Sequence, residues 1–191
     1  MKIHIVLIMS VLCLCCMESR AQRRLPGQQG IQLLAGLSDG YGFGKDKNIS
    51  FYTSAILSRY TKNSHKWLYG LEYWEKRYCY KCRRIPTSQI TLEGGYYYNF
   101  LSDRGKNVFF SVGLSVLAGY ETTNWGKKVF PDGARLKNKD KFIAGAGITL
   151  EIETFITDYL VFLINARERV LNSDVGQFHS QFGIGLKYIY K

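Results

Sequence analysis

Apolar and polar positions alternate along most of this chain, and the alternation is clearest near its C-terminal end. Read backwards from Tyr190, every second residue is mostly apolar as far as Phe178, while the residues between are mostly polar or small. A period of two predicts a strand with two unlike faces, because successive side chains of a strand point to opposite sides. Eight segments of this kind are predicted, at about 30–38, 49–60, 67–78, 87–100, 108–121, 141–155, 159–169 and 178–190.

The two faces differ most clearly in the fifth and sixth of these segments. In 108–121, the face that runs from Val108 to Tyr120 is apolar, whereas the opposite face is largely glycine and serine. The segment 141–155 has the same character, and only 49–60 leaves open which residues share a side. Sustained stripes with a helical period are lacking, so the pattern predicts an all-β chain.

The connections between the segments alternate in length. The second, fourth and sixth, 61–66, 101–107 and 156–158, are short and turn-like, whereas the others are mostly longer, the fifth (122–140) most of all. Short turns that alternate with longer loops are typical of outer-membrane barrels, with the turns in the periplasm. This arrangement places both termini on the periplasmic side.

The composition of the less apolar face distinguishes a membrane barrel from a soluble one such as a lipocalin. A solvated outer face would be dense with charged and polar side chains, whereas here it is mainly glycine, serine and single carboxylates. Small residues with a few charges suit the crowded lumen of an eight-stranded barrel. We therefore predict an eight-stranded antiparallel up-and-down transmembrane β-barrel of the outer-membrane type, with a soluble barrel as the alternative. Aromatic residues near the strand ends suit an interfacial girdle: Trp67, Tyr69, Tyr96, Tyr98, Phe100, Tyr159, Tyr188 and Tyr190.

The N-terminal residues have the features of an export signal. Lys2 precedes an apolar run over 3–17, and small residues stand at the −3 and −1 positions of a cleavage site after Ala21. This pattern predicts a secretory signal peptide over 1–21 and a single barrel domain over 22–191 in the outer membrane. A lipoprotein processed at a cysteine of the signal segment is the weaker alternative, because the residues before each cysteine are not small.

Cleavage after Ala21 would leave 24 basic and 14 acidic residues in the mature chain, a formal charge of +10. Only Cys79 and Cys82 would remain, so no disulfide framework supports this domain. We expect the pair to form a local disulfide that braces an external loop. A redox centre is less favoured because no βαβ pattern surrounds the pair, and a zinc site would need further ligands.

A lumen-facing charge network follows from the predicted faces. An isolated charge in a narrow lumen would be costly, so the inward charges are expected to pair across the barrel and close it. A gated channel whose pairs exchange partners is the alternative, although eight strands leave little open bore. The predicted network comprises Glu72, Glu93, Glu151, Glu153, Arg167, Arg169 and Lys187.

No enzyme is predicted. His179 faces inward, and Ser111 and Ser115 share that face of the barrel, but nothing in the spacing selects a nucleophile, a base and an orienting acid. No cofactor is expected, and an outer-membrane lipid-modifying enzyme remains the less favoured reading.

Surplus basic residues gather in the predicted loops, around 75–84 and within 122–140. Such patches attract polyanions, so lipopolysaccharide or a partner protein is the expected partner of an outer surface. Interleaved tyrosines and lysines also suit nucleic acid, but direct DNA binding is not expected. The strand that ends at Tyr190, with Gly185 and Tyr188 before it, is typical of the C-terminal signal read by the barrel-assembly machinery.

Several stretches, spread in order over most of the predicted domain, together point to one family. They are 84–86, 93–103, 118–122, 124–128, 131–133, 149–153, 166–169 and 178–183. Together they resemble the conjugal transfer protein TraO family of Bacteroides-type conjugative transposons. The resemblance implies a part in conjugative DNA transfer, at the outer-membrane end of a type IV secretion apparatus, and it implies no catalytic residue. We predict a structural or docking subunit that contacts other conjugation proteins, with a general porin-like or adhesive barrel as the alternative.

Overall fold

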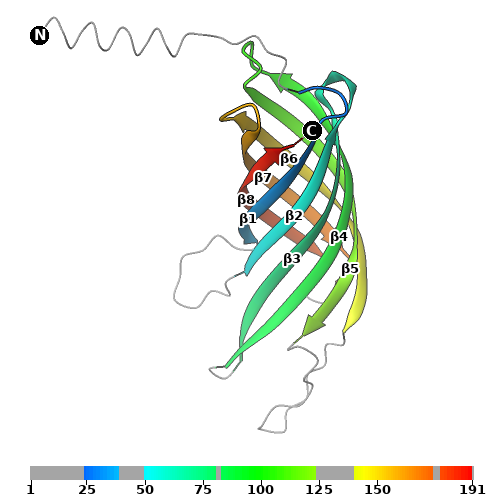
Figure 1. Cartoon of the computed structure of the whole chain (residues 1–191). Helices are drawn as coiled ribbons and strands as arrows, with labels where there is room; N and C mark the ends of the chain where they lie inside the picture. Colours follow the sequence, from blue (N-terminus) through cyan, green and yellow to red (C-terminus); the bar gives the residue numbers. More distant parts are fainter. Residues whose placement is uncertain (1–23, 39–49, 81–82, 124–139, 174–176, 191) are drawn as a thin grey trace, which may run out of the picture.

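The chain closes into one barrel of eight antiparallel strands in the computed structural model, which describes residues 24–38, 50–80, 83–123, 140–173 and 177–190 (Figure 1). The predicted signal peptide (1–21) and most of the fifth loop lie outside these residues. Within the described residues, no helix is long and apolar enough to cross a lipid bilayer. The strands are β1 (Gln29–Ser38), β2 (Ser50–Tyr60), β3 (Lys66–Tyr80), β4 (Arg83–Ser102), β5 (Val108–Thr123), β6 (Lys141–Phe155), β7 (Leu160–Leu171) and β8 (Phe178–Ile189).

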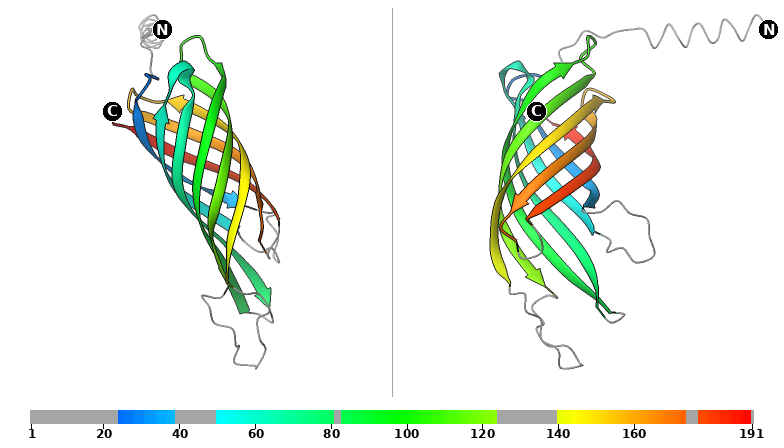
Figure 2. Two further views of the ribbon diagram at one scale, coloured as in Figure 1. Left: turned by 90° about the vertical axis from the view of Figure 1, so that its right-hand side faces the viewer. Right: turned by 180° about the vertical axis from the view of Figure 1, so that it is seen from behind.

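Each strand pairs with its neighbours in sequence, and β1 pairs with β8 to close the barrel. The closing register sets Leu33 opposite Leu186, so no edge is left exposed. The strands lean across the barrel axis, and β3 and β4 run further than the others at the end away from the C-terminus (Figure 2). The predicted eight-stranded antiparallel up-and-down barrel is thus confirmed.

The predicted faces follow the alternation of burial along each strand. Leu114 and Val116 on β5 are 65% and 69% exposed, whereas Ser115 between them is buried. The outward side chains are therefore apolar and the inward ones largely polar, the reverse of a water-soluble barrel. In β2, whose facing the sequence left open, Tyr52 and Ile56 point inward and Leu57 points outward.

The third connection is shorter than predicted, because β3 reaches Tyr80 and β4 begins at Arg83. The predicted segments 67–78 and 87–100 left a connection over 79–86, and that boundary is wrong. Pro86 pairs with Arg77 of β3, while the pairing of β4 with β5 begins only at Thr87. The proline therefore lies beyond the described pairing of β4 with β5, and a residue without an amide hydrogen is tolerated outside the middle of a sheet.

The barrel interior holds two clusters of buried apolar side chains. The larger includes Tyr60, Tyr97 and Phe109 and lies toward the end that carries the short turns, and the smaller joins Leu117 to Ile143 and Leu171. Tyr97 lies flat over Gly113, where a Cβ atom would come within 2.5 Å of the ring. The glycine therefore makes room for the ring, as in a lumen that side chains fill completely.

The short turns, 61–65, 103–107 and 156–159, lie at one end of the barrel, which we call the turn end. The first described residues lie there too, since the amide of Gly27 donates to the carbonyl of Tyr60 at 2.8 Å. The amide of Tyr190 donates to the carbonyl of Gln29 at 3.0 Å, which fixes the C-terminal strand to the first. Both ends of the described chain thus meet at the turn end (Figure 1).

Candidate functional site

The carboxylate of Glu153 is the centre of a buried ionic cluster near the turn end, which we call the lower layer. It accepts hydrogen bonds from Arg24, Lys66 and Lys187. The hydroxyl of Tyr60 donates to the same carboxylate at 2.9 Å and accepts from Lys187 at 2.8 Å. The donors come from the segment before β1 and from β2, β3 and β8, so the cluster joins distant parts of the wall.

Arg24 reaches into the lumen from the turn end and is buried. Its guanidinium lies 3.8 Å from the ring centre of Phe109 and 5.1 Å from that of Tyr60. It also donates to the backbone carbonyl of Ser64 at 2.9 Å. Cation–π contact with two rings and an ion pair with Glu153 hold the segment before β1 inside the mouth.

A second ionic cluster, the upper layer, lies further from the turn end. Arg167 on β7 bonds Glu72 at 3.0 Å and Glu93 at 2.8 Å, so one guanidinium links β3 and β4 across the lumen. Arg169 pairs with the other oxygen of Glu72, and Gln181 donates to that oxygen at 3.0 Å. The fork geometry of arginine suits two carboxylates at once.

Polar contacts continue toward the opposite end of the barrel, which carries the longer connections and which we call the loop end. Gln89 donates to Glu121 at 2.8 Å, and Ser173 donates to the same carboxylate. His179 packs edge-on against the buried ring of Trp74, with the ring centres 5.1 Å apart. The lumen is therefore filled by polar and aromatic side chains along its length.

Both layers are sealed from water, and this decides their energetics. The side chains of Glu72 and Glu153 are 1% and 0% exposed. In such surroundings the attraction within a pair is opposed by the loss of hydration, so the pairs themselves add little net stability. Loss of one partner leaves a bare buried charge, however, and costs about 3–5 kcal/mol. The layers therefore fix one arrangement of the strands and fill the space between them.

The structure brings all the residues of the predicted network into these two layers, with Glu151 paired to Lys66 in the lower one. Sequence reasoning missed Arg24, Lys66 and Tyr60. Lys66 was assigned to a turn, although it continues the inward alternation of 67–78 by one position. Arg24 precedes the first strand, where no periodicity could indicate which way it points.

The other predicted residues are dispersed. His179 is the second residue of β8 at the loop end, whereas Ser111 is the fourth residue of β5 at the turn end, so the two lie at opposite ends of the barrel. Cys82 lies outside the described residues, as do the contacts of the Cys79 side chain. Among the residues described, no group of three or more histidine, cysteine, aspartate and glutamate side chains could hold a metal ion.

Of the three residues of the predicted assembly signal, which lie at or just after the end of β8, one faces the lumen and two point outward. Gly185 faces the lumen against Leu34, while Tyr188 and Tyr190 point outward. The hydroxyl of Tyr190 donates to the side chain of Gln29 at 3.1 Å. These aromatic side chains lie at the turn end, where an interfacial girdle is expected.

The family model of "Conjugative transposon protein TraO" matches residues 25–190, nearly all of the described barrel. The chain belongs to this family. The comparison with curated proteins gave no significant match. The TraO match begins at the residue after Arg24, so it spans every strand of both ionic layers.

Solved structures similar to this TraO family member are eight-stranded outer-membrane proteins. Neisserial surface protein A (NspA) aligns with 13% identity and a TM-score of 0.54, covering 85% of this chain and 97% of its own. Ail, the attachment invasion locus protein of Yersinia pestis, was solved with the heparin analogue sucrose octasulfate. It aligns with 10% identity and a TM-score of 0.56, covering 87% of this chain and 100% of its own. The N-terminal barrel domain of Pseudomonas aeruginosa OprF aligns with 9% identity and a TM-score of 0.50, covering 86% of this chain and 99% of its own. At these identities the likeness extends to the fold alone.

Proposed function

We propose that this chain is an outer-membrane barrel that serves conjugative DNA transfer as a structural or docking subunit, without catalysis of its own. The observation that carries the proposal is the TraO family match across residues 25–190. The barrel supplies the second half of the argument, because its closed wall and apolar outer face suit a lipid bilayer.

Placement in the outer membrane is supported by the outward side chains. Leu92, Val116 and Ile148 are exposed on the wall, and aromatic residues such as Trp67 and Tyr188 mark its turn end. An outward apolar band with aromatic girdles is the signature of outer-membrane barrels. On this reading the short turns face the periplasm and the basic loops face outward toward lipopolysaccharide. The signal peptide and the assembly signal at Tyr190 are parts of the same proposal.

The plugged lumen argues for docking rather than for a conduit. Arg167 spans the lumen from β7 to Glu72 on β3 and Glu93 on β4, which leaves no bore for a DNA strand. Contacts with the other conjugation proteins would then form at the two ends of the barrel. Direct binding of nucleic acid is not part of the proposed role.

Deletion of the gene from its conjugative element tests the proposal most directly. We expect the transfer frequency to fall by orders of magnitude and to recover when the wild-type gene is supplied in trans. The protein should fractionate with the outer membrane and resist extraction by salt. Unchanged mating in the deletion strain would remove the conjugation role, whatever the location of the barrel.

Site-specific crosslinking in mating cells tests the docking role. Photoreactive residues at Arg104 and Thr157, in two described turns, should capture conjugation proteins from the periplasmic side. The matched control is an outward wall position such as Leu57, where lipid alone is expected. A docking role fails if the turns capture no more protein than the wall does.

A further inference from the structure

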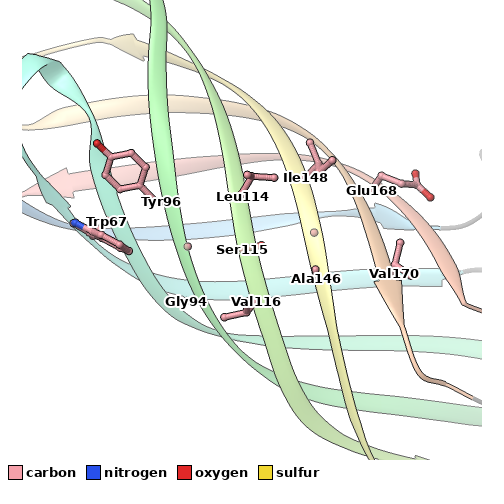
Figure 3. A pocket seen from close by; sticks show the side chains of 12 residues that line it. Trp67, Gly94, Tyr96, Leu114, Ser115, Val116, Ala146, Ile148, Glu168 and Val170 are labelled. Atoms are coloured by element: carbon pink, nitrogen blue, oxygen red, sulfur yellow. The ribbon is translucent and has the colours of Figure 1, made fainter.

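A shallow groove of about 620 Å³ crosses the outer wall of the barrel from β3 to β7 (Figure 3). Its floor is low where Gly94 and Ala146 present little or no side chain, and Leu114 and Ile148 stand beside them. A Cβ atom added to Gly94 would meet nothing within 4 Å, so this glycine is not required by packing within the chain.

The groove follows one register row of the sheet. Trp67 pairs with Tyr96, Tyr96 with Leu114, Leu114 with Ile148, Ile148 with Glu168 and Glu168 with Ser180. Because the strands are tilted, such a row climbs the wall as it crosses it. It rises from Trp67 near the turn end toward Glu168 in the loop half of the barrel.

Glu168 is a carboxylate on the lipid-facing side of β7. Val170 and Ala166 flank it on its own strand, and Phe178 and Phe182 flank Ser180 on β8. The hydroxyl of Ser180 donates to one oxygen of Glu168 at 2.5 Å. An ionisable group that faces lipid is costly and marks a functional site by default.

The described outward positions between the aromatic girdles include no lysine or arginine. Arg59 and Arg77 also point outward, but they lie at the two ends of the wall, opposite Trp67 and Pro86. The described wall of a second copy would therefore bring no cation to Glu168. Charge complementarity favours an ammonium group from another molecule.

The depth of Glu168 favours a lipid as the source of that group. Two register pairs, Arg169 with His179 and Val170 with Phe178, separate it from the loop end of β7 and β8. A headgroup at the outer boundary of the bilayer can reach that depth. From β3 to β7 the groove spans four strand spacings, about 19 Å in all. The acyl chains of one leaflet cover about 15 Å, half of the hydrocarbon core, so one chain fits along the slanting groove.

We propose that this groove binds an outer-leaflet lipid, with one acyl chain over Gly94 and Ala146 and an ammonium group of the same lipid on Glu168. The proposal rests on the outer-membrane placement proposed above. It adds a site that selects one kind of lipid to a wall that otherwise contacts any lipid of the bilayer. The apolar lining with one polar group at its end is the usual design of a site for an amphiphile.

Tryptophan quenching by brominated lipids tests the proposal, because Trp67 lines the end of the groove toward which the chain tip would point. The full chain with Trp125→Phe is placed in vesicles of equal parts phosphatidylethanolamine and phosphatidylglycerol, only one of which carries brominated chains. Trp74 is buried in the lumen and is shielded from both lipids. Brominated phosphatidylethanolamine should quench Trp67 more, with a preference of about threefold, as expected of a partly solvated ion pair.

Two substitutions should abolish that preference. Glu168→Gln removes the charge but keeps the shape and an acceptor for Ser180, and Ala146→Leu fills the floor of the groove. The matched control is Ala55→Leu, an outward alanine on β2 away from the groove, which should leave the preference unchanged.

The outcomes separate this inference from the membrane placement itself. Equal quenching by both lipids in the wild-type chain, or an unchanged preference in Glu168→Gln, would overturn the lipid site while leaving the barrel in the membrane. Absence of quenching by either lipid would instead refute the membrane placement. Weak quenching that grows as the protein is diluted in the bilayer would show a second copy in the groove and would also overturn the lipid site.

Discussion

Glu72 and Glu75 lie three residues apart on β3, and their ion-pair partners have different surroundings. Glu72 points into the lumen and holds both arginines of the upper layer, which are buried. Glu75 pairs with Arg77, whose side chain is 48% exposed, and also accepts a hydrogen bond from the hydroxyl of Tyr73 at 2.7 Å. The two ion pairs should therefore differ widely in what their loss costs, because loss of Glu72 leaves buried guanidinium groups without a counter-charge, whereas loss of Arg77 leaves Glu75 with the Tyr73 hydroxyl.

The first prediction is that Glu72→Gln lowers the free energy of unfolding by about 3–5 kcal/mol, since Arg167 and Arg169 lose a buried counter-charge. Urea titration of the barrel in lipid vesicles measures this. Arg77→Gln is the matched control and should cost less than about 1 kcal/mol. Equal effects of the two substitutions would show that the upper layer is hydrated.

The second prediction concerns two glycines on opposite faces of the wall. Gly113→Ala pushes a methyl group into the ring of Tyr97 and should cost about 1–3 kcal/mol, as overpacking does. Gly94→Ala adds the same methyl group to open space and should be neutral or slightly stabilising, because glycine weakens a strand. The same unfolding titration compares them. A neutral Gly113→Ala would mean that Tyr97 moves freely in the lumen.

At the level of elements, the third prediction concerns which side chains of β5 contact lipid. Spin labels at successive positions from 110 to 118 should show oxygen accessibility with a period of two, high at Val112 and Val116 and low at Ser111 and Ser115. Ile148 on β6 should match the high positions. Uniform accessibility along β5, or a polar environment at Val112, would contradict contact of this face with lipid.

How well the sequence predicts a strand depends on how much the surroundings of its two faces differ. Segments 108–121 and 141–155 were placed well, because one face of each strand points outward and the other into the lumen, and this difference leaves a strict period of two. The adjoining ends of β3 and β4 were not placed well. There the two strands stay paired as far as Tyr80 and Arg83, beyond the part of the chain in which apolar and polar residues alternate. Pro86 lies within β4 and pairs with Arg77 of β3, beyond the described pairing of β4 with β5.

The same reasoning explains which residues of the two layers could be found in advance. Glu93, Glu151 and Arg167 interrupt apolar strands at inward positions, so alternation alone assigns them to the lumen. Their partners could not be deduced, since pairing across a barrel depends on shear and tilt. Arg24 gave no signal, because it lies outside any strand and is positioned by the rings of Tyr60 and Phe109.

For the whole molecule, two ionic layers in series predict a barrel that does not conduct. The fourth prediction is that the wild-type chain in a planar bilayer shows no steady current. Arg24→Ala should conduct no better, because the bonds from Arg167 to Glu72 and Glu93 still block the path. A stable open level in the wild-type chain would support the gated-channel reading instead.

The position of Arg24 also restricts how the protein can be labelled. Four residues separate it from the start of β1 at Gln29, and its guanidinium occupies the space between two rings inside the mouth. An affinity tag fused directly ahead of it would crowd the rim at the turn end and draw the arginine out. A reporter attached with a long spacer, or inserted into the described turn at 103–107, leaves that anchor in place.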